Sequence, residues 1–220
     1  MRQLLLVRPE PGLSASAERA RQLGLDVIAC PLFRIEALDW AAPDPRDFDG
    51  LLLTSANAAR TGGRQLGMLK SLPVYAVGAA TAAAAQSAGL AVAAIGEGDA
   101  ADLLAMLPET IRLLHLAGEN HRATATDHPI ERLITYRSAA IERPGLPLLQ
   151  GLVVAIHSPR AGARLAAMTK QRDQTALAVI SEAAAEAAGP GWERVEVARR
   201  PDDPSLLALA AMLCHTSRPK

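Results

Sequence analysis

The stretch DGLLLTSANAAR at residues 49–60 sets the pattern of this chain, because a short apolar run ends in Thr-Ser and gives way to an alanine-rich segment. The stretch LVVAIHSPRAGAR at 152–164 has the same pattern, and its Ser158 lies 103 residues after Ser55. A buried strand that leads directly into a helix is the βα unit of parallel sheets. The two stretches therefore predict an α/β fold.

The same alternation of apolar runs and alanine-rich segments extends along the whole chain. The apolar runs predict strands at Leu4–Val7, Val27–Cys30, Leu51–Thr54, Val74–Val77, Ala91–Ala94, Leu113–Leu116, Val153–His157, Ala176–Ile180 and Arg194–Val197. The segments between them predict helices at Ala15–Leu23, Asn57–Met68, Ala80–Ala88, Ala100–Leu107, Arg160–Met168, Glu182–Ala188 and Pro204–Leu213.

The offset of 103 residues recurs at separated places, which indicates an internal duplication rather than chance agreement between alanine-rich segments. The further matches at this offset are Phe33-Arg34 with Tyr136-Arg137, the segment from Val77 with that from Ile180, and DLLAML at 102–107 with SLLALA at 205–210. The opening LLLVRPE at 4–10 resembles LLHLAGE at 113–119 at an offset of 109, so the second copy is about six residues shorter in the stretch 120–129.

The duplication predicts two lobes joined by two crossing segments, near 33–37 and 134–138. Lobe one comprises residues 1–35 and 139–220, and lobe two comprises residues 38–133. In this arrangement the crossing segments form a hinge, and a ligand binds in the cleft between the lobes.

Composition excludes several classes of function. Only six of the 220 residues are aromatic, and 23 basic residues balance 23 acidic ones, so neither a base-stacking surface nor a basic patch for nucleic acid is expected. Cys30, Cys214 and the five histidines have no metal-site spacing. No apolar run is long enough for a signal peptide or a membrane span, so we expect a cytoplasmic protein without nucleic-acid or membrane partners. The balanced charge also favours a monomer.

The residues around the two serines suit an anion. Ser55 and Asn57 in lobe two, and Ser158 and Arg160 at the equivalent place, stand where a strand ends and unpaired backbone N–H groups begin a helix. The alternative is that the two serines are ordinary helix N-caps. Arg8 also follows a strand, and an arginine fork there suits a carboxylate.

Three more residues are candidates for the site. Thr81 lies in the first turn of a helix after Gly78, and Ser181 follows the equivalent strand of the second copy. Tyr136 lies in the second crossing segment, where its hydroxyl could donate a proton or orient a leaving group; the alternative is a half-buried strand aromatic with its hydroxyl in water.

These residues together resemble the uroporphyrinogen-III synthase family. The stretches that carry the resemblance keep the family's order over nearly the whole chain: LLVRPEPG at 5–12, PLFRIE at 31–36, DGLLLTSANAAR at 49–60, VYAVGAATAAAAQSAG at 74–89, ITYRSA at 134–139, HSPRAGARL at 157–165 and VEVARRPDDPSLLALAAML at 195–213. The resemblance implies two similar α/β lobes with parallel, flavodoxin-like sheets flanked by helices and joined by a two-stranded linker.

The resemblance also implies an activity. The family closes hydroxymethylbilane, a linear tetrapyrrole with carboxylate side chains, into uroporphyrinogen III with loss of water and inversion of the last ring, without cofactor or metal. By resemblance, Tyr136 is the residue that assists departure of the hydroxyl, and the substrate-binding positions are Arg8, Ser55, Asn57, Thr81, Ser158, Arg160 and Ser181. A transient hand-over of substrate from hydroxymethylbilane synthase is expected.

The chain departs from the family pattern in lobe one. Ser181 and Ala184 stand where the family usually has Gly-x-x-Thr, and His157 replaces the more usual threonine before Ser158. The competing hypothesis is a non-catalytic two-lobed module that binds a small polyanion or a tetrapyrrole, which would keep the duplication and would not need Tyr136.

Overall fold

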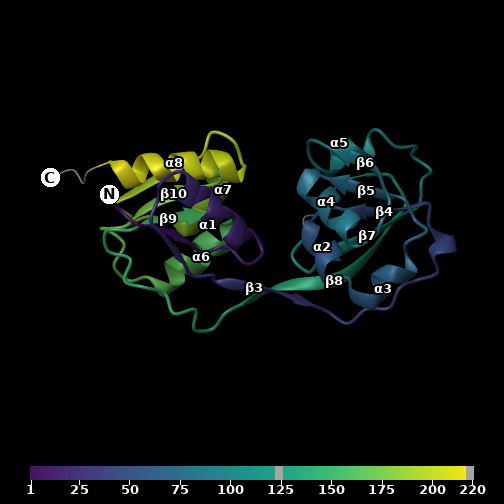
Figure 1. Ribbon diagram of the computed structural model, residues 1–220, viewed down its shortest axis with the longest axis horizontal. Coiled ribbons are helices and arrows are strands. Elements are labelled where there is room, and N and C mark those ends of the chain that lie inside the picture. The colour runs from purple at the N-terminus through teal and green to yellow at the C-terminus, as the bar shows by residue number, and fades with distance from the viewer. Residues whose placement is uncertain (122–125, 217–220) are drawn as a thin grey trace. The chain divides into compact units, whose positions relative to one another are not determined.

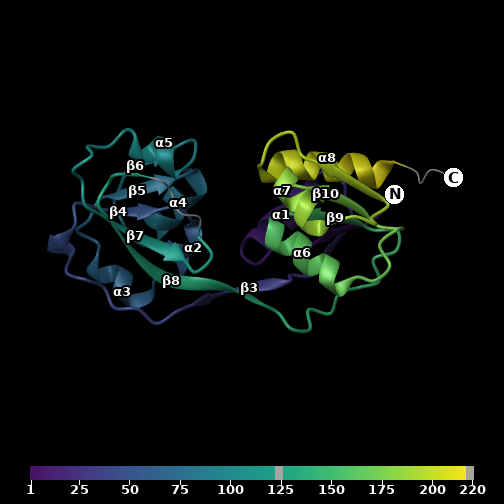
Figure 2. The same cartoon turned by 180° about the vertical axis from the view of Figure 1, so that it is seen from behind.

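The computed structural model describes residues 1–121 and 126–216, and it divides into two compact units. Unit 1 comprises Met1–Arg34 and the chain from Ala139 onward, and unit 2 comprises Ile35–Ser138. Each unit is a sheet flanked by helices, as Figures 1 and 2 show from opposite sides. The predicted α/β class with parallel sheets is confirmed.

The sheet of unit 1 has five parallel strands in the order β11-β10-β9-β1-β2. In chain order the strands are β1 (Leu4–Leu6), β2 (Val27–Ala29), β9 (Val153–Ile156), β10 (Ala176–Val179) and β11 (Arg194–Val197). The spatial order is thus 2-1-3-4-5, which is the flavodoxin-like arrangement. At its centre β1 pairs with β9, with Leu5 opposite Val154.

The sheet of unit 2 has the order β3-β8-β7-β4-β5-β6. The strands are β3 (Phe33–Ala37), β4 (Gly50–Leu53), β5 (Val74–Val77), β6 (Val92–Gly96), β7 (Leu113–Gly118) and β8 (Ile130–Ala140). Strand β7 lies beside β4 as β1 lies beside β9. The five strands β6-β5-β4-β7-β8 therefore correspond in spatial order to β11-β10-β9-β1-β2, although the chain visits them in a different sequence. The two segments that carry the chain between the units, β3 and β8, are neighbours, and Leu38 donates its N–H to the Thr135 carbonyl at 2.9 Å.

Two layers of helices cover the unit 1 sheet because successive strand residues point to opposite faces. Leu4 and Leu6 pack against α1 (Gly12–Gln22) and α8 (Asp203–His215). Leu5 faces the other way, onto α6 (Pro159–Met168) and α7 (Glu182–Ala188). Both layers are visible in Figure 1.

Helices cover the two faces of the unit 2 sheet unequally. Three helices, α2 (Ala56–Thr61), α3 (Gly63–Met68) and α4 (Ala79–Ser87), pack on one face, whereas α5 (Ala100–Leu104) packs on the other. By the duplication, the counterpart of α1 would fall in the shortened stretch 120–129, of which residues 122–125 lie outside the described part of the chain.

The single helix predicted over Asn57–Met68 is wrong, because the structure has two helices there. Gly63, at the junction of α2 and α3, has a φ of +60°, in the left-handed region that glycine adopts without strain. A short 3-10 helix at Pro45–Asp47, capped by the Asp44 carboxylate, was not expected from the sequence.

The helix caps follow the duplication. Ser55 caps α2 by accepting the Asn57 N–H, and Ser158 caps α6 by accepting the Ala161 N–H. The same offset relates Asp99, which caps α5, to Asp202, which caps α8. These paired caps fix where each helix begins, so the ends of equivalent strands present equivalent helix N-termini.

Candidate functional site

Except for Tyr136, the predicted site residues lie at the carboxyl ends of the parallel strands or in the first turns of the helices that follow, and Tyr136 lies within β8 beside the carboxyl end of β7. Open parallel sheets bind ligands at this edge, beside the point where the strand order reverses. That point falls between β1 and β9 in unit 1 and between β7 and β4 in unit 2. The structure places Ser55, Asn57, Thr81 and Tyr136 in unit 2, and Arg8, Ser158, Arg160 and Ser181 in unit 1.

In unit 2, Tyr136 lies on β8 opposite Gly118, the last residue of β7. The register between the two strands shifts just before this pair, between Ala117 and Gly118. The phenol is half-buried and packs at the border of the core on the α2–α4 face. A bulge at the end of a strand redirects a side chain, and here it sets the position of Tyr136.

The two helices that follow β4 and β5 in unit 2 begin differently: a serine side chain caps α2, whereas α4 begins after a glycine without a side-chain cap. Ser55 Oγ accepts the Asn57 N–H at 3.2 Å, so the capping role considered for this serine is present. Its O–H can still donate a hydrogen bond, since capping uses only the oxygen as acceptor. Gly78, with a φ of +81°, precedes α4, and Thr81 in the first turn of that helix is buried.

A buried histidine that the sequence analysis did not single out lies beside these residues. His115 on β7 is 4% exposed, and its Nε2 is 3.0 Å from Thr54 Oγ1 at the end of β4. Burial lowers the pKa of His115 to about 4, assisted by the nearby charges of Arg132 and His121. The imidazole is therefore neutral near pH 7. The sequence signal that could have identified His115 is its position within the apolar run LLHLAG at 113–118, which predicts a buried imidazole.

In unit 1, one carboxylate joins four donors. Asp203, at the start of α8, accepts from Arg8 Nη1 at 3.0 Å, Ser16 Oγ at 2.5 Å and His157 Nε2 at 2.7 Å through Oδ1. Its Oδ2 accepts from Arg19 Nε at 3.2 Å. These bonds connect β1, α1, β9 and α8 at the carboxyl edge of the sheet. Neither Asp203 nor Ser16 was identified from the sequence.

The charge states in this cluster follow from burial and hydrogen bonding. Burial opposes ionisation of Asp203, but hydrogen bonds from His157 and Ser16 outweigh it and lower its pKa to about 2. Burial lowers the pKa of His157, and the bond to Asp203 only partly offsets this effect. Because an ionised carboxylate only accepts, Nε2 carries the proton of the neutral imidazole. Its Nδ1 is buried and has no hydrogen-bond partner in the described part of the chain.

Arg8 uses one nitrogen of its guanidinium within the cluster. Nη1 bonds Ser16 and Asp203, and these are the only hydrogen bonds that the described residues form with this side chain. The Nε–Nη2 edge lies over Gly12, where an added Cβ would stand 2.6 Å from both nitrogens. This edge has the two parallel donors that match a carboxylate.

The remaining predicted residues of unit 1 do not share one role. Ser158 Oγ accepts the Ala161 N–H at 3.2 Å, and Ser181 caps α7 without a side-chain hydrogen bond. The guanidinium of Arg160 lies 4.8 Å from the centre of the Phe33 ring, a cation–π geometry. Ala184, which stands where the family usually has threonine, is fully buried in the core on the α6–α7 face.

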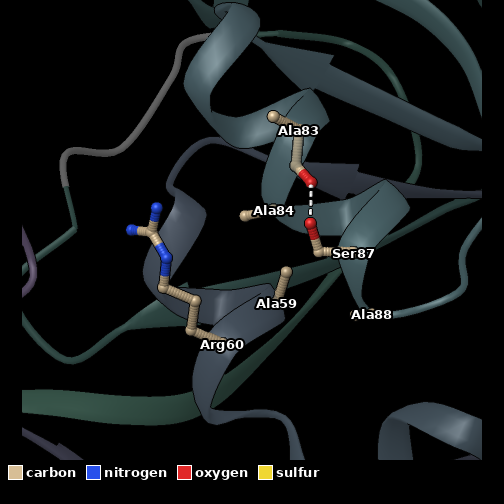
Figure 3. Close-up of a pocket in the computed structure, with 6 residues that line it drawn as sticks. All are labelled: Ala59, Arg60, Ala83, Ala84, Ser87 and Ala88. Atoms are coloured by element: carbon tan, nitrogen blue, oxygen red, sulfur yellow. Dashed lines mark hydrogen bonds between the residues drawn. The ribbon is translucent and has the colours of Figure 1, made fainter.

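A surface hollow of about 350 Å³ lies away from the strand ends, between α2 and α4. Figure 3 shows its lining of alanines, with Arg60 extending away from them. The Ser87 hydroxyl there donates to the Ala83 carbonyl at 2.8 Å. The Ser87 hydroxyl is already hydrogen-bonded to the helix backbone, and the other lining residues except Arg60 are alanines. We therefore do not assign a catalytic role to this hollow.

Two further features of the described residues bear on function. Within residues 1–121 and 126–216, no three His, Cys, Asp or Glu side chains gather in a way that could hold a metal ion. None of the helices in this part of the chain has the length and apolar character needed to cross a bilayer.

Two parallel-sheet units with one strand order and matching helix caps define a duplicated, flavodoxin-like α/β protein. A family model described as uroporphyrinogen-III synthase HemD matches residues 14–208. The chain belongs to the uroporphyrinogen-III synthase family, whose members are lyases of tetrapyrrole biosynthesis. The resemblance inferred from the sequence is confirmed.

Solved structures of the family share the fold. The uroporphyrinogen-III synthetase from Helicobacter pylori is 18% identical, with a TM-score of 0.69 over 97% of this chain and 100% of that chain. A mutant uroporphyrinogen III synthase from the extremely thermophilic bacterium Thermus thermophilus is 19% identical, with a TM-score of 0.51 over 96% of this chain and 99% of that chain. No curated protein sequence matches the chain significantly.

The buried His115 predicts a pH dependence of stability. The folded state keeps this imidazole neutral down to a pKa of about 4, whereas the unfolded chain binds a proton near pH 6.5. Stability therefore falls as the pH is lowered from 6.5 to 4, by at most about 3 kcal/mol from this group. Urea unfolding at a series of pH values should show this slope, and His115→Gln should reduce it.

His215→Gln is the control, because His215 is an exposed residue at the end of α8. It should leave the slope unchanged. His157 contributes in the same direction and remains in both variants. An identical slope in wild type and His115→Gln would contradict the assignment of a strongly lowered pKa to His115.

Proposed function

We propose that this chain converts hydroxymethylbilane to uroporphyrinogen III by closing the macrocycle with inversion of the last ring. The observation that carries the proposal is membership of the uroporphyrinogen-III synthase family over residues 14–208. The position of Tyr136 on β8, beside the carboxyl end of β7, supports a catalytic role for its hydroxyl. No step of the proposed mechanism calls for a cofactor.

The proposed mechanism begins with departure of the terminal hydroxyl. Tyr136 donates its proton to that oxygen, water leaves, and the pyrrole nitrogen stabilises the resulting azafulvene cation. The substituted carbon of the last pyrrole attacks this cation and forms a spiro intermediate. The intermediate fragments to a second cation, which recloses with the ring inverted and loses a proton. The charge balance is restored when that proton is returned to the tyrosinate or to solvent.

The protein's main contribution is to fold the substrate so that the substituted carbon reacts instead of the free terminal position. The protein can position the substrate by binding its carboxylates. The backbone N–H groups at the starts of α2, α4, α6 and α7 are suitable donors, with Ser55, Asn57, Thr81, Ser158 and Ser181 beside them. Donors distributed in this way are compatible with a chain of zero net charge.

The two arginines have different parts in the proposal. Arg8 binds a substrate carboxylate through its Nε–Nη2 edge, while Asp203 and Ser16 hold Nη1. Arg160 adds positive charge near a second carboxylate while it stacks on Phe33. We also propose that the protein acts as a cytoplasmic monomer and receives its substrate transiently from hydroxymethylbilane synthase, since the free bilane closes spontaneously to isomer I.

The first experiment is a coupled assay of product isomers. Porphobilinogen and hydroxymethylbilane synthase generate the substrate, and the products are oxidised and separated by chromatography as uroporphyrin I or III. We expect the purified protein to shift the product from isomer I to isomer III. Isomer I alone, from protein shown to be folded by circular dichroism, would reject the enzyme and favour a binding module.

Tyr136→Phe should reduce kcat by about ten- to a hundredfold. The reduction is smaller than for many general acids because a pyrrole-stabilised cation forms with little acid assistance. Tyr75→Phe, which removes the other tyrosine hydroxyl of the chain, should retain wild-type kcat in the isomer assay. Wild-type kcat in Tyr136→Phe would remove the hydroxyl from the mechanism.

Arg8→Lys tests the proposed carboxylate contact. Lysine can still pair with Asp203 but lacks two parallel donors, so KM should rise about tenfold with a smaller effect on kcat. Arg19→Lys is the matched control, because Arg19 contacts the other oxygen of the same carboxylate from a more exposed position. Equal KM values in the two folded variants would contradict a role for Arg8 in binding.

A further inference from the structure

Gly118 lies where a side chain would collide with Tyr136. A Cβ built on Gly118 would stand 2.6 Å from Tyr136 Cζ, 2.7 Å from Cε2 and 2.9 Å from the hydroxyl oxygen. Carbon atoms do not approach this closely, since van der Waals contact begins near 3.5 Å. The phenol thus occupies the space that any other residue type at 118 would fill.

The backbone on both sides of this contact is fixed. Glu119 donates its N–H to the Tyr136 carbonyl at 2.9 Å, which ties the chain after Gly118 to β8. The Gly118 carbonyl accepts the His121 N–H at 3.0 Å, and His121 Nδ1 lies 3.0 Å from the same oxygen. The strand end cannot withdraw from the ring without breaking these bonds.

Gly118 is needed for its size and not for its backbone conformation. Its φ lies outside the left-handed region, unlike those of Gly63 and Gly78, so alanine can adopt the same backbone without strain. A methyl group at 118 would therefore displace the nearest side-chain atoms and leave the backbone in place. Those atoms are the outer half of the phenol ring, which carries the hydroxyl.

We propose that Gly118 is a positioning residue for Tyr136, whose missing side chain sets where the phenolic hydroxyl meets the substrate. The inference rests on the proposed role of Tyr136 as the group that assists hydroxyl departure. A side chain as small as alanine at 118 rotates the ring and moves the hydroxyl, while the fold of unit 2 persists. A shift of about 1 Å at a catalytic group is sufficient for a large loss of rate.

Unit 2 contains a matched control. Tyr75 on β5 packs on Gly50 of β4, where an added Cβ would stand 2.5 Å from Tyr75 Cε2. The same substitution, Gly→Ala, therefore collides with a tyrosine ring in each case, and at Gly50 the added Cβ would also stand 3.0 Å from the Pro73 carbonyl oxygen. Only Tyr136 is assigned to the reaction, so Gly50→Ala imposes at least as severe a steric effect on unit 2 without the proposed catalytic one.

The first part of the test needs no activity. Full-length protein labelled with 3-fluorotyrosine contains two fluorine labels, one for each tyrosine of the chain. Tyr75→Phe assigns the two 19F resonances. Gly118→Ala should shift the Tyr136 resonance and leave that of Tyr75 in place, and Gly50→Ala should do the reverse. An unmoved Tyr136 resonance in Gly118→Ala would overturn the inference, whatever the activity.

The second part uses the isomer assay. In Gly118→Ala, kcat for isomer III should fall at least about tenfold with little change in KM, and Gly50→Ala should keep the wild-type kcat. Adding Tyr136→Phe to Gly118→Ala should cause no further loss, since the displaced hydroxyl is already ineffective. A merely structural glycine would give additive losses, and this result would also overturn the inference.

The two parts distinguish failure of the inference from failure of the proposed function. If the Tyr136 resonance moves and Tyr136→Phe is fully active, the hydroxyl has no role and Gly118 positions nothing for catalysis. If Tyr136→Phe is impaired and Gly118→Ala is fully active, the catalytic role of Tyr136 stands and the positioning role of Gly118 is rejected.

Discussion

The central strands of both sheets are buried on both faces, and this constraint determines where chemistry can occur. The residues of β1, β4, β9 and β10 are all buried, because helices cover each side of a parallel sheet. Polar side chains within these strands would lose their water without finding partners. They are therefore confined to the strand ends, where helix N-termini supply N–H donors. His115 on β7 is an exception within a strand, and it is kept neutral beside Thr54.

Duplication gave the two units one strand order but not one chemistry. In unit 1 the switch-point edge carries a charged cluster in which Asp203 gathers Arg8, Ser16 and His157. In unit 2 the predicted site residues at the equivalent edge are uncharged, and the Tyr136 ring lies against Gly118. The proposed division assigns part of the anion binding to unit 1 and proton donation to unit 2.

Features that depend only on residues close together in the chain could be predicted from the sequence. The strands, most helices and the serine caps follow from apolar runs and from residues adjacent in the chain, and the family was identified from ordered motifs. The break at Gly63 was missed because glycine in a helical pattern is compatible with either outcome until its φ is known. The partners of Arg8 could not be found in this way, since Asp203 reaches it only through packing of α8 against α1. Burial of His115 beside Thr54 likewise depends on the pairing of β4 with β7.

The pairing of β1 with β9 has a consequence for synthesis on the ribosome. Unit 2 is continuous in the chain, so all of its strands leave the ribosome before β9 does. Strand β1 is made first, yet its central neighbour arrives only after the whole of unit 2. Until then its apolar Leu4–Leu6 edge has no β9 beside it, and unpaired apolar strand edges promote aggregation. Nascent chains from which unit 2 has emerged but β9 has not would therefore combine a complete unit 2 with an aggregation-prone N-terminal segment, a combination suited to chaperones that bind short apolar peptides.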